Sequence, residues 1–330
     1  MKIVSNFSHT PGVHCGSTAL RDLLGYIGLD YSEPMCFGLG SGLGFIYYHT
    51  DAGTTPSHNI YGRTITLERD LCQHLALDWE EGVDDDPAHA WAKAKEWLDR
   101  DVPLLLYVEL SQLPYYRTRT PFPGHRVIVA GYDDERQVAL LADTQFPGLQ
   151  PISYTALAAA RSAKIPPIPL NNEWLAIKPT SKPRPLGEAI RLALRDNALG
   201  MNLDRAPHQG IMGMEMLAED FESWGEYPDW AFCVRLAYQN IEVRGTGGGM
   251  FRRIYVQFLQ EAASLDKQLE QAQLATNMQE IADEWTGLAV LLQRASAEKE
   301  RKVLAEASRA IRRLAMREEN FWGRVLDLLA

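Results

Sequence analysis

Prolines divide the chain at one place. Between Ile165 and Pro185 lie six of the 18 prolines, and proline neither continues a helix nor joins the middle of a sheet. Before this stretch the patterns of helices and strands alternate, whereas after it they are almost wholly helical. A chain of 330 residues is long enough for two domains. The sequence therefore predicts an α+β domain over residues 1–178, an all-helical domain over residues 179–330, and a proline-rich linker where they meet.

The composition is that of a globular protein and excludes several classes of function. Hydrophobic residues make up 46% and charged residues 23% of the chain, which is typical of soluble domains. The formal net charge of −10 argues against nucleic acid as the main partner, because phosphate binding needs a basic surface. The most apolar stretches, residues 104–108 and 127–130, are too short to cross a membrane. The N-terminus lacks the apolar core of a signal peptide, so we expect a cytoplasmic protein.

One of the four cysteines lies where a thiol becomes reactive. The four are Cys15, Cys36, Cys72 and Cys233. They form no CxxC pair, and in a reducing compartment we expect free thiols. Apolar side chains at positions 20, 23, 24 and 27 have the spacing of a buried helix face, which places Cys15 in the first turn. There the helix dipole and unpaired N–H groups lower the pKa of a thiol and can hold an oxyanion, while Gly16 and Ser17 leave room for a substrate.

The same patterns predict the other elements. A helix is predicted at residues 67–75, and another begins at Asp86 and Pro87, which suit a helix cap and the first helical position. Strands are predicted at residues 104–110, 125–130 and 137–143. In the second part, helices are predicted at residues 187–199, 210–222, 227–241, 250–263, 266–292 and 295–329.

A predicted hairpin gives Cys15 its partners. A five-residue loop centred on Asp134 would pair Gly131 with Gln137. In that register His125 stands directly opposite Asp143, at cross-strand distance. A histidine oriented by a carboxylate is what a general base for a cysteine nucleophile requires. The alternative is that His125 only ends a strand and Asp143 only caps a turn.

Three stretches resemble a known family. Residues 7–22, FSHTPGVHCGSTALRD, and residues 32–45, SEPMCFGLGSGLGF, resemble the N-terminal domain of the butirosin biosynthesis protein H family. Residues 245–255, GTGGGMFRRIY, resemble the helical domain that accompanies it. Together the resemblance covers nearly the whole chain.

The resemblance implies a fold and a reaction. The family is similar to papain-like cysteine enzymes, and its named member transfers an aminoacyl side chain from an acyl carrier protein to an aminoglycoside amine. By that resemblance Cys15 is the nucleophile, His125 the base and Asp143 the residue that orients it. It implies an acyl or peptidyl carrier protein as partner, whose phosphopantetheine arm is the acyl donor, and a small-molecule amine acceptor, with no cofactor bound directly. Papain-like peptidases usually have an oxyanion-hole glutamine six residues before the cysteine, and that position here is His9.

Glycine-rich segments complete the predicted site. Residues 38–44 are rich in glycine, but without a preceding strand or a ribose-binding acid they predict a flexible loop beside the substrate rather than a nucleotide site. Residues 245–249 are interpreted either as a turn before a solvated helix or as a mobile element over the thioester. The residues predicted to contact substrate are His9, His14, Gly16, Ser17, Gly40, Gly42, Gly248 and Arg252. No metal site is expected, because the cysteine and histidines near residue 15 lack a recognisable fourth ligand.

Three functional hypotheses remain open. The first is transfer of an acyl or aminoacyl group from a carrier thioester to an amine, through an acyl intermediate on Cys15. The second is a peptidase or amidase that uses the same three residues and lets water resolve the intermediate. The third is a binding or scaffold protein in which the cysteine does no chemistry. Arginines along residues 301–313 are interpreted as a solvated face or as a surface for an acidic carrier, and the long last helices as a possible homodimer interface.

Overall fold

The chain forms two compact units that do not follow one another in sequence. A computed structural model describes residues 1–50, 55–122, 124–166, 168–180, 182–203 and 206–330. The first unit consists of residues 1–36 and 75–184, and the second of residues 37–74 and 185–330. The chain crosses between the units after residues 36, 74 and 184, and the predicted boundary at residue 178 is close to the third of these crossings. The prediction did not anticipate that residues 37–74 belong with the helical part.

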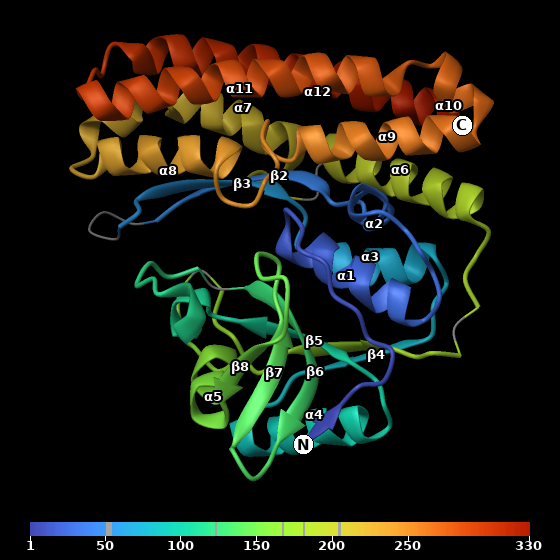
Figure 1. The fold of residues 1–330 in the computed structure, drawn as a ribbon. Coiled ribbons are helices and arrows are strands. Elements are labelled where there is room, and N and C mark those ends of the chain that lie inside the picture. Colours follow the sequence, from blue (N-terminus) through green and yellow to red (C-terminus); the bar gives the residue numbers. More distant parts are fainter. Residues whose placement is uncertain (51–54, 123, 167, 181, 204–205) are drawn as a thin grey trace. The chain divides into compact units, whose positions relative to one another are not determined.

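The first unit is built on an antiparallel sheet (Figure 1). Its strands are β1 (Lys2–Ile3), β4 (Trp79–Gly82), β5 (Leu104–Val108), β6 (His125–Asp133), β7 (Val138–Ala142), β8 (Gln150–Ser153) and β9 (Trp174–Ile177). They lie in the order β4-β9-β5-β6-β7-β8, and β1 pairs with β6. The three predicted strands are the central ones, and each is within two residues of its predicted start. The first unit is thus a mixture of helices and an antiparallel sheet, as the α+β prediction requires.

The hairpin of β6 and β7 has a different register from the one predicted. Asp133 pairs with Val138, so the loop has four residues, and a bulge between Val129 and Gly131 shifts the pairing by one residue. Each one-residue shift turns side chains to the other face of a sheet. Beyond the bulge, the register carried on from the pairing of Val129 with Leu141 places Asp143 diagonally across from His125 on the same face. The bulge therefore brings His125 and Asp143 onto the same face of the sheet, as the prediction required, although the pairing of the two strands differs from the predicted one.

Helices cover the sheet of the first unit. They are α1 (Cys15–Tyr26), α4 (Pro87–Asp99) and α5 (Tyr154–Arg161), with the short 3-10 helices η1 (Leu110–Gln112) and η2 (Pro114–Tyr116). Helix α1 packs against β6. Asp86 caps α4 as predicted, accepting hydrogen bonds from the backbone N–H groups of Ala88 and His89. A buried apolar core of valine, leucine and tryptophan side chains lies on the sheet, and it fixes the strands that carry the candidate site.

The predicted proline-rich linker contains a strand. Trp174, Leu175, Ala176 and Ile177 form β9, which pairs with both β4 and β5 and is buried along its length. Prolines are frequent on both sides of this strand but absent from it, so its backbone donors remain available for pairing. Pro167, one of the six prolines, lies outside the described residues. The linker interpretation was therefore wrong for residues 174–177.

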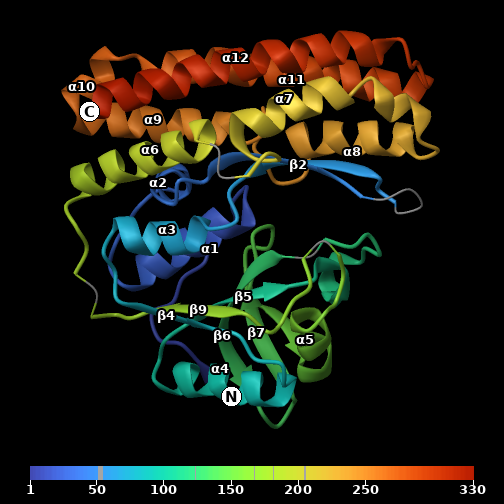
Figure 2. The same cartoon turned by 180° about the vertical axis from the view of Figure 1, so that it is seen from behind.

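The second unit is mainly helical and includes one hairpin. Its strands are β2 (Leu43–His49) and β3 (His58–Arg63), and its helices are α3 (Leu67–His74), α6 (Leu186–Asn202), α7 (Gly210–Asp220), η3 (Ser223–Glu226), α8 (Trp230–Glu242), α9 (Arg252–Leu265), α10 (Lys267–Gln271), α11 (Leu274–Glu298) and α12 (Val303–Leu329). Helix α2 (Glu33–Leu39) contains the first crossing between the units. The hairpin packs against α7 and α8, and α11 and α12 run side by side (Figures 1 and 2).

The helices of the second unit follow the prediction with differences in the last two. The helix predicted at residues 266–292 is divided into α10 and α11 at Gln273, whose φ of 52° lies in the left-handed region. The break predicted after residue 292 comes later, because α11 runs to Glu298 and α12 begins at Val303. The hairpin of β2 and β3 was not predicted. Among the described residues, none of the helices has the length and apolarity needed to cross a membrane.

Candidate active site

Cys15 is the first residue of α1. His14 caps this helix, because its Nδ1 accepts a hydrogen bond from the backbone N–H of Ser17. Cys15 is partly exposed, whereas Cys36, Cys72 and Cys233 are buried. A thiol at a helix N-terminus meets the positive end of the helix dipole. Among the four cysteines, Cys15 therefore combines solvent access with an environment that favours a thiolate.

A buried carboxylate holds the backbone before the cysteine. Oε1 of Glu33 accepts hydrogen bonds from the backbone N–H of His14 at 2.8 Å and from the hydroxyls of Ser17 and Thr18 at 3.1 Å each. Both oxygens of Glu33 also lie within 3.1 Å of the backbone N of Val13. Any side chain at Gly12 would run into Thr18 and Glu33. The hydroxyl of Ser17 is thus bonded to Glu33 at the start of α1. The same glutamate fixes the segment that carries Cys15.

His125 and Asp143 form a buried pair. Nε2 of His125 lies 2.8 Å from Oδ1 of Asp143, and the two side chains are 5% and 0% exposed. Two tyrosines complete the carboxylate's shell: the hydroxyl of Tyr115 donates to Oδ2 at 2.8 Å, and that of Tyr116 donates to Oδ1 at 2.9 Å. Each oxygen of Asp143 has at least one donor, as a buried carboxylate requires. Asp143 is therefore held in one orientation.

The histidine lies between the carboxylate and the thiol. Because Nε2 of His125 is bonded to Asp143, Nδ1 is the ring nitrogen left for the hydrogen bond with Cys15. Burial of the thiol opposes ionisation, but hydrogen bonds and charge from His125 and His14 outweigh it and hold the pKa of Cys15 well below its usual range. These residues therefore favour a thiolate paired with an imidazolium.

Asp143 maintains the charge of that imidazolium. Burial lowers the pKa of His125, but the charge and hydrogen bond of Asp143, together with Cys15, raise it to about 10. Burial opposes the charge of Asp143 as well, and His125 and the two tyrosine hydroxyls overcome this and lower the pKa of the carboxyl. The three groups thus stabilise one another's charged forms.

His14 acts on both the helix start and the thiol. The residue is 3% exposed, and its Nδ1 accepts a hydrogen bond from the backbone N–H of Ser17 at 3.3 Å. Its side chain also helps His125 to lower the pKa of Cys15. Two histidines therefore favour the thiolate form of Cys15.

His9 lies in the first unit and is fully engaged by protein groups. Its Nδ1 is 2.5 Å from Oδ2 of Asp22, and its Nε2 is 3.1 Å from the carbonyl oxygen of Asp143 and 2.9 Å from that of Phe146. The side chain is 4% exposed. Both ring nitrogens are therefore occupied, which leaves neither for the substrate contact predicted from the sequence.

Arg252 lies inside the second unit rather than on a mobile element. Its guanidinium is fully buried and forms two hydrogen bonds with Glu318, at 2.9 and 2.7 Å. The group also lies over the ring of Trp285, whose indole N–H donates to the same glutamate. Neither interpretation of this segment, as a solvated helix start or as a cover for substrate, matches a buried ion pair. The prediction that Arg252 binds substrate is corrected to a structural role.

Of the predicted substrate-binding glycines, Gly16 is the second residue of α1 in the first unit and is buried, whereas the other three belong to the second unit and pack closely there. A Cβ at Gly40 would lie 2.5 Å from the carbonyl oxygen of Leu67, and one at Gly42 would lie 2.7 Å from that of Phe37. Residues 39–45 are buried throughout, so this segment is a packed turn and not the predicted flexible loop. Gly248 has a φ of 88° in a turn where its backbone N–H donates to the Thr246 hydroxyl and that of Gly249 donates to Glu242. These glycines serve backbone packing.

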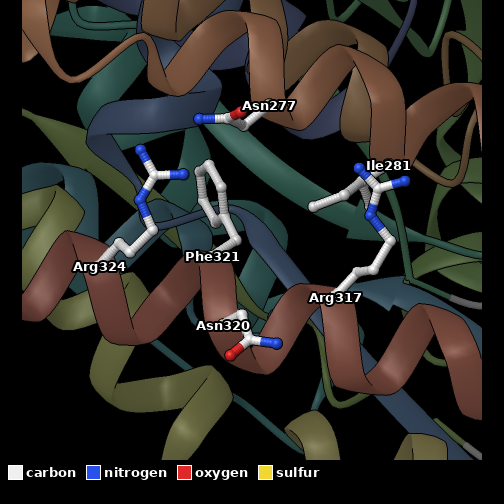
Figure 3. A pocket seen from close by; sticks show the side chains of 6 residues that line it. All are labelled: Asn277, Ile281, Arg317, Asn320, Phe321 and Arg324. Carbon is white, nitrogen blue, oxygen red and sulfur yellow. The ribbon is translucent and has the colours of Figure 1, made fainter.

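The second unit has a pocket between α11 and α12 (Figure 3). Its volume is about 210 Å³, and its lining residues are Asn277, Ile281, Arg317, Asn320, Phe321 and Arg324. The charge of Arg317 is balanced by Glu280 and Glu284, and Arg324 donates to the carbonyl of Ala272. Its two arginines thus already have acceptors within the unit. In the described part of the chain, no three His, Cys, Asp or Glu side chains gather as a metal site would require.

Sequence reasoning missed four residues of the site. Glu33, Tyr115, Tyr116 and Asp22 contact the predicted residues through side-chain hydrogen bonds. Nothing in the spacing of two adjacent tyrosines after a strand indicates that they contact a carboxylate. For Asp22 a signal existed, since it is on the helix of Cys15 and seven residues beyond it, two turns along the same face.

Comparison with known proteins gives two matches. A family model described as the N-terminal part of butirosin biosynthesis protein H matches residues 14–144. A second model, described as a domain of unknown function (DUF4872), matches residues 155–325. No curated protein matches the chain. The first match includes Cys15, His125 and Asp143, whereas His9 lies before it.

Proposed function

Because the chain belongs to the butirosin biosynthesis protein H family, we propose that it is a cysteine acyltransferase of natural-product biosynthesis. Its reaction moves an acyl or aminoacyl group from a carrier-protein thioester to an amine. The observation that carries this proposal is the bond of His125 to Asp143 beside Cys15 at the start of a helix, and the lowered pKa of the thiol and raised pKa of the histidine agree with it. Membership of the family supports a role in antibiotic biosynthesis, and Cys15 is the proposed nucleophile.

We further propose that the first unit is papain-like. A cysteine at the start of a helix, a histidine on an antiparallel sheet, and a side-chain oxygen bonded to Nε2 of that histidine support this. The geometry is recognised by the roles of the residues rather than by their positions in sequence.

The first half-reaction forms an acyl-enzyme. The Cys15 thiolate attacks the carbonyl carbon of the donor thioester, and the negative charge moves to the carbonyl oxygen. The backbone N–H groups at the start of α1, beginning with that of Cys15, stabilise this oxyanion. The C–S bond to the donor then breaks, and the departing phosphopantetheine thiolate takes the proton of the His125 imidazolium. The products are acyl-Cys15, neutral His125 and the free carrier thiol.

The second half-reaction forms the amide. The acceptor amine attacks the acyl-Cys15 carbonyl, and neutral His125 takes the proton that the amine must lose. The Cys15 thiolate leaves, so the imidazolium–thiolate pair is restored. Asp143 keeps the His125 ring in the required tautomer throughout. Since donor and acceptor react in separate steps, the kinetics should be ping-pong.

Intact mass spectrometry of the full chain tests this function. The protein is incubated with an acyl-phosphopantetheine thioester, first alone and then with an aminoglycoside. The proposal requires an acyl adduct on wild-type protein, none on Cys15→Ala, and release as an amide when the amine is added. Cys36→Ala serves as the matched control and should keep the adduct, because Cys36 is buried. Release only as free acid would favour hydrolysis, and absence of any adduct would contradict the proposal.

A further inference from the structure

His9 joins two parts of the candidate site that are distant in sequence. One ring nitrogen bonds Asp22 on α1, the helix that carries Cys15. The other nitrogen bonds the carbonyl oxygens of Asp143 and Phe146, in the turn that follows β7. These contacts cross 13 to 137 residues of sequence. The histidine thus links the element of the nucleophile to the element of the orienting carboxylate.

All of these contacts require protons on the imidazole. Carbonyl oxygens only accept hydrogen bonds, so Nε2 carries a proton. Nδ1 faces the carboxylate of Asp22, whose other oxygen accepts from Arg21 at 2.8 Å. Burial lowers the pKa of His9, but the bond and charge of Asp22 and the two carbonyls raise it overall. The facing charged groups are therefore Asp22 and, behind it, Arg21.

The turn that His9 holds also positions the shell of Asp143. The carbonyl oxygen of Asp143 accepts from both Nε2 of His9 and the backbone N–H of Phe146. The ring of Phe146 packs edge-on against Tyr115 and Tyr116, and these tyrosines donate to the carboxylate of Asp143. Movement of this turn would displace the carboxylate together with its donors.

We propose that His9 is a positioning residue, a doubly donating clasp between α1 and the turn after β7 that keeps Asp143 aligned on His125. The inference rests on the proposed function. It replaces the expectation that this position contacts substrate or holds an oxyanion, because both donors of the ring are used within the protein. A clasp acts on the thiol through Asp143 and His125, so its effect exists before any substrate binds.

Alkylation of Cys15 by iodoacetamide as a function of pH tests the clasp without a substrate. The variants are His9→Gln, Asp22→Asn and their combination, with His89→Gln as the matched control at an exposed histidine. A glutamine side chain is similar in length to that of histidine. Its single amide nitrogen cannot donate both to Asp22 and to the carbonyl oxygens on the other side. The clasp predicts that His9→Gln moves the inflection of the alkylation profile toward that of an ordinary thiol. On the acidic limb of the profile, below the wild-type inflection, the rate should fall by about tenfold or more, the factor that a one-unit displacement produces.

Asp22→Asn should move the inflection in the same direction, and the double variant should move it no further than the larger single effect. This variant keeps an acceptor of the same size, so it provides the test if His9→Gln does not fold. A role limited to stability would lower the unfolding midpoint and leave the inflection in place, which would overturn the clasp. Loss of acyl transfer with an unchanged inflection would instead assign His9 to the oxyanion and also overturn it. An ordinary profile in wild-type protein would reject the proposed function itself.

Discussion

Oδ1 of Asp143 lies 2.8 Å from Nε2 of His125, and this bond decides which nitrogen of the ring serves the Cys15 thiol. The carboxylate reaches the histidine diagonally from the residue that follows β7, on the face restored by the bulge in β6. Its two oxygens are satisfied by one histidine and two tyrosines. The candidate site is therefore set up by an irregularity in the sheet as much as by the residues themselves.

Two substitutions of Asp143 should slow acyl transfer to different extents. Asp143→Ala removes a charge-assisted hydrogen bond of about 1.5–3 kcal/mol, so we expect the rate of acyl transfer to fall by about 10- to 100-fold. Asp143→Asn keeps an oxygen that can accept from Nε2 and should lose less. Rates of amide formation by the three proteins provide the comparison. Equal loss in both variants would show that charge alone, and not orientation, is what Asp143 supplies.

The two tyrosine hydroxyls on Asp143 should contribute to folding stability. Tyr115→Phe and Tyr116→Phe each leave a buried carboxylate with one donor fewer, and each should lower the free energy of unfolding by about 1–3 kcal/mol. Tyr132→Phe is the matched control, since its hydroxyl donates to an exposed aspartate, Asp99, and such a bond contributes below about 1 kcal/mol. Urea denaturation measures all three. A loss in the control as large as in the other two would contradict this interpretation.

His14→Asn separates helix capping from activation of the thiol. Asparagine is a strong N-cap residue, so α1 should keep its stability. The substitution removes the imidazole that helps to lower the pKa of Cys15. We expect the inflection of the alkylation profile to move up, and the rate on its acidic limb to fall by about tenfold for a one-unit displacement, with little change in the unfolding midpoint. Unchanged alkylation would mean that His14 serves only the helix start.

The buried ion pair of Arg252 and Glu318 should be important for stability. Removing one partner of such a pair costs about 3–5 kcal/mol, because the other charge remains buried. Arg252→Met should therefore lower the free energy of unfolding by that amount, and Arg252→Met with Glu318→Met should recover part of it. Arg253→Met is the control, since Arg253 pairs with the exposed carboxylate of Asp283 and donates to the hydroxyl of Thr286. If Arg252→Met unfolds no more easily than the control, the structural assignment of Arg252 is wrong.

Sequence patterns predicted elements well where the signal is local. The apolar spacing that follows Cys15 and the Asp86–Pro87 start signal identified α1 and α4, and the cysteine is in the first turn as expected. The register of β6 and β7 was wrong because the turn lies at residues 134–137 rather than 132–136, and a bulge that leaves no local pattern in an apolar strand then shifts the pairing again. The strand β9 was missed because prolines surround its four apolar residues.

The site was harder to predict because its support comes from contacts distant in sequence. Cys15, His125 and Asp143 were identified from a helix start, a hairpin and a resemblance, and the structure brings all three together. Their roles in catalysis stay a prediction. Arg252 and the glycines of residues 38–44 were assigned to substrate from composition, yet their neighbours, such as Glu318 and Leu67, are buried partners that no spacing reveals. The contacts of His9 likewise depend on a turn far along the chain.

The pH dependence of Cys15 alkylation tests the central claim most directly. The rate is measured on the peptide that contains Cys15, in wild-type protein and in His125→Ala. The low thiol pKa predicts a wild-type rate that is already at its plateau at neutral pH, with an inflection well below that of an ordinary thiol, whose pKa is about 8.5. In His125→Ala the inflection should move up toward that value. A wild-type rate that rises through about pH 8–9 as for a free cysteine, and that does not depend on His125, would contradict the account.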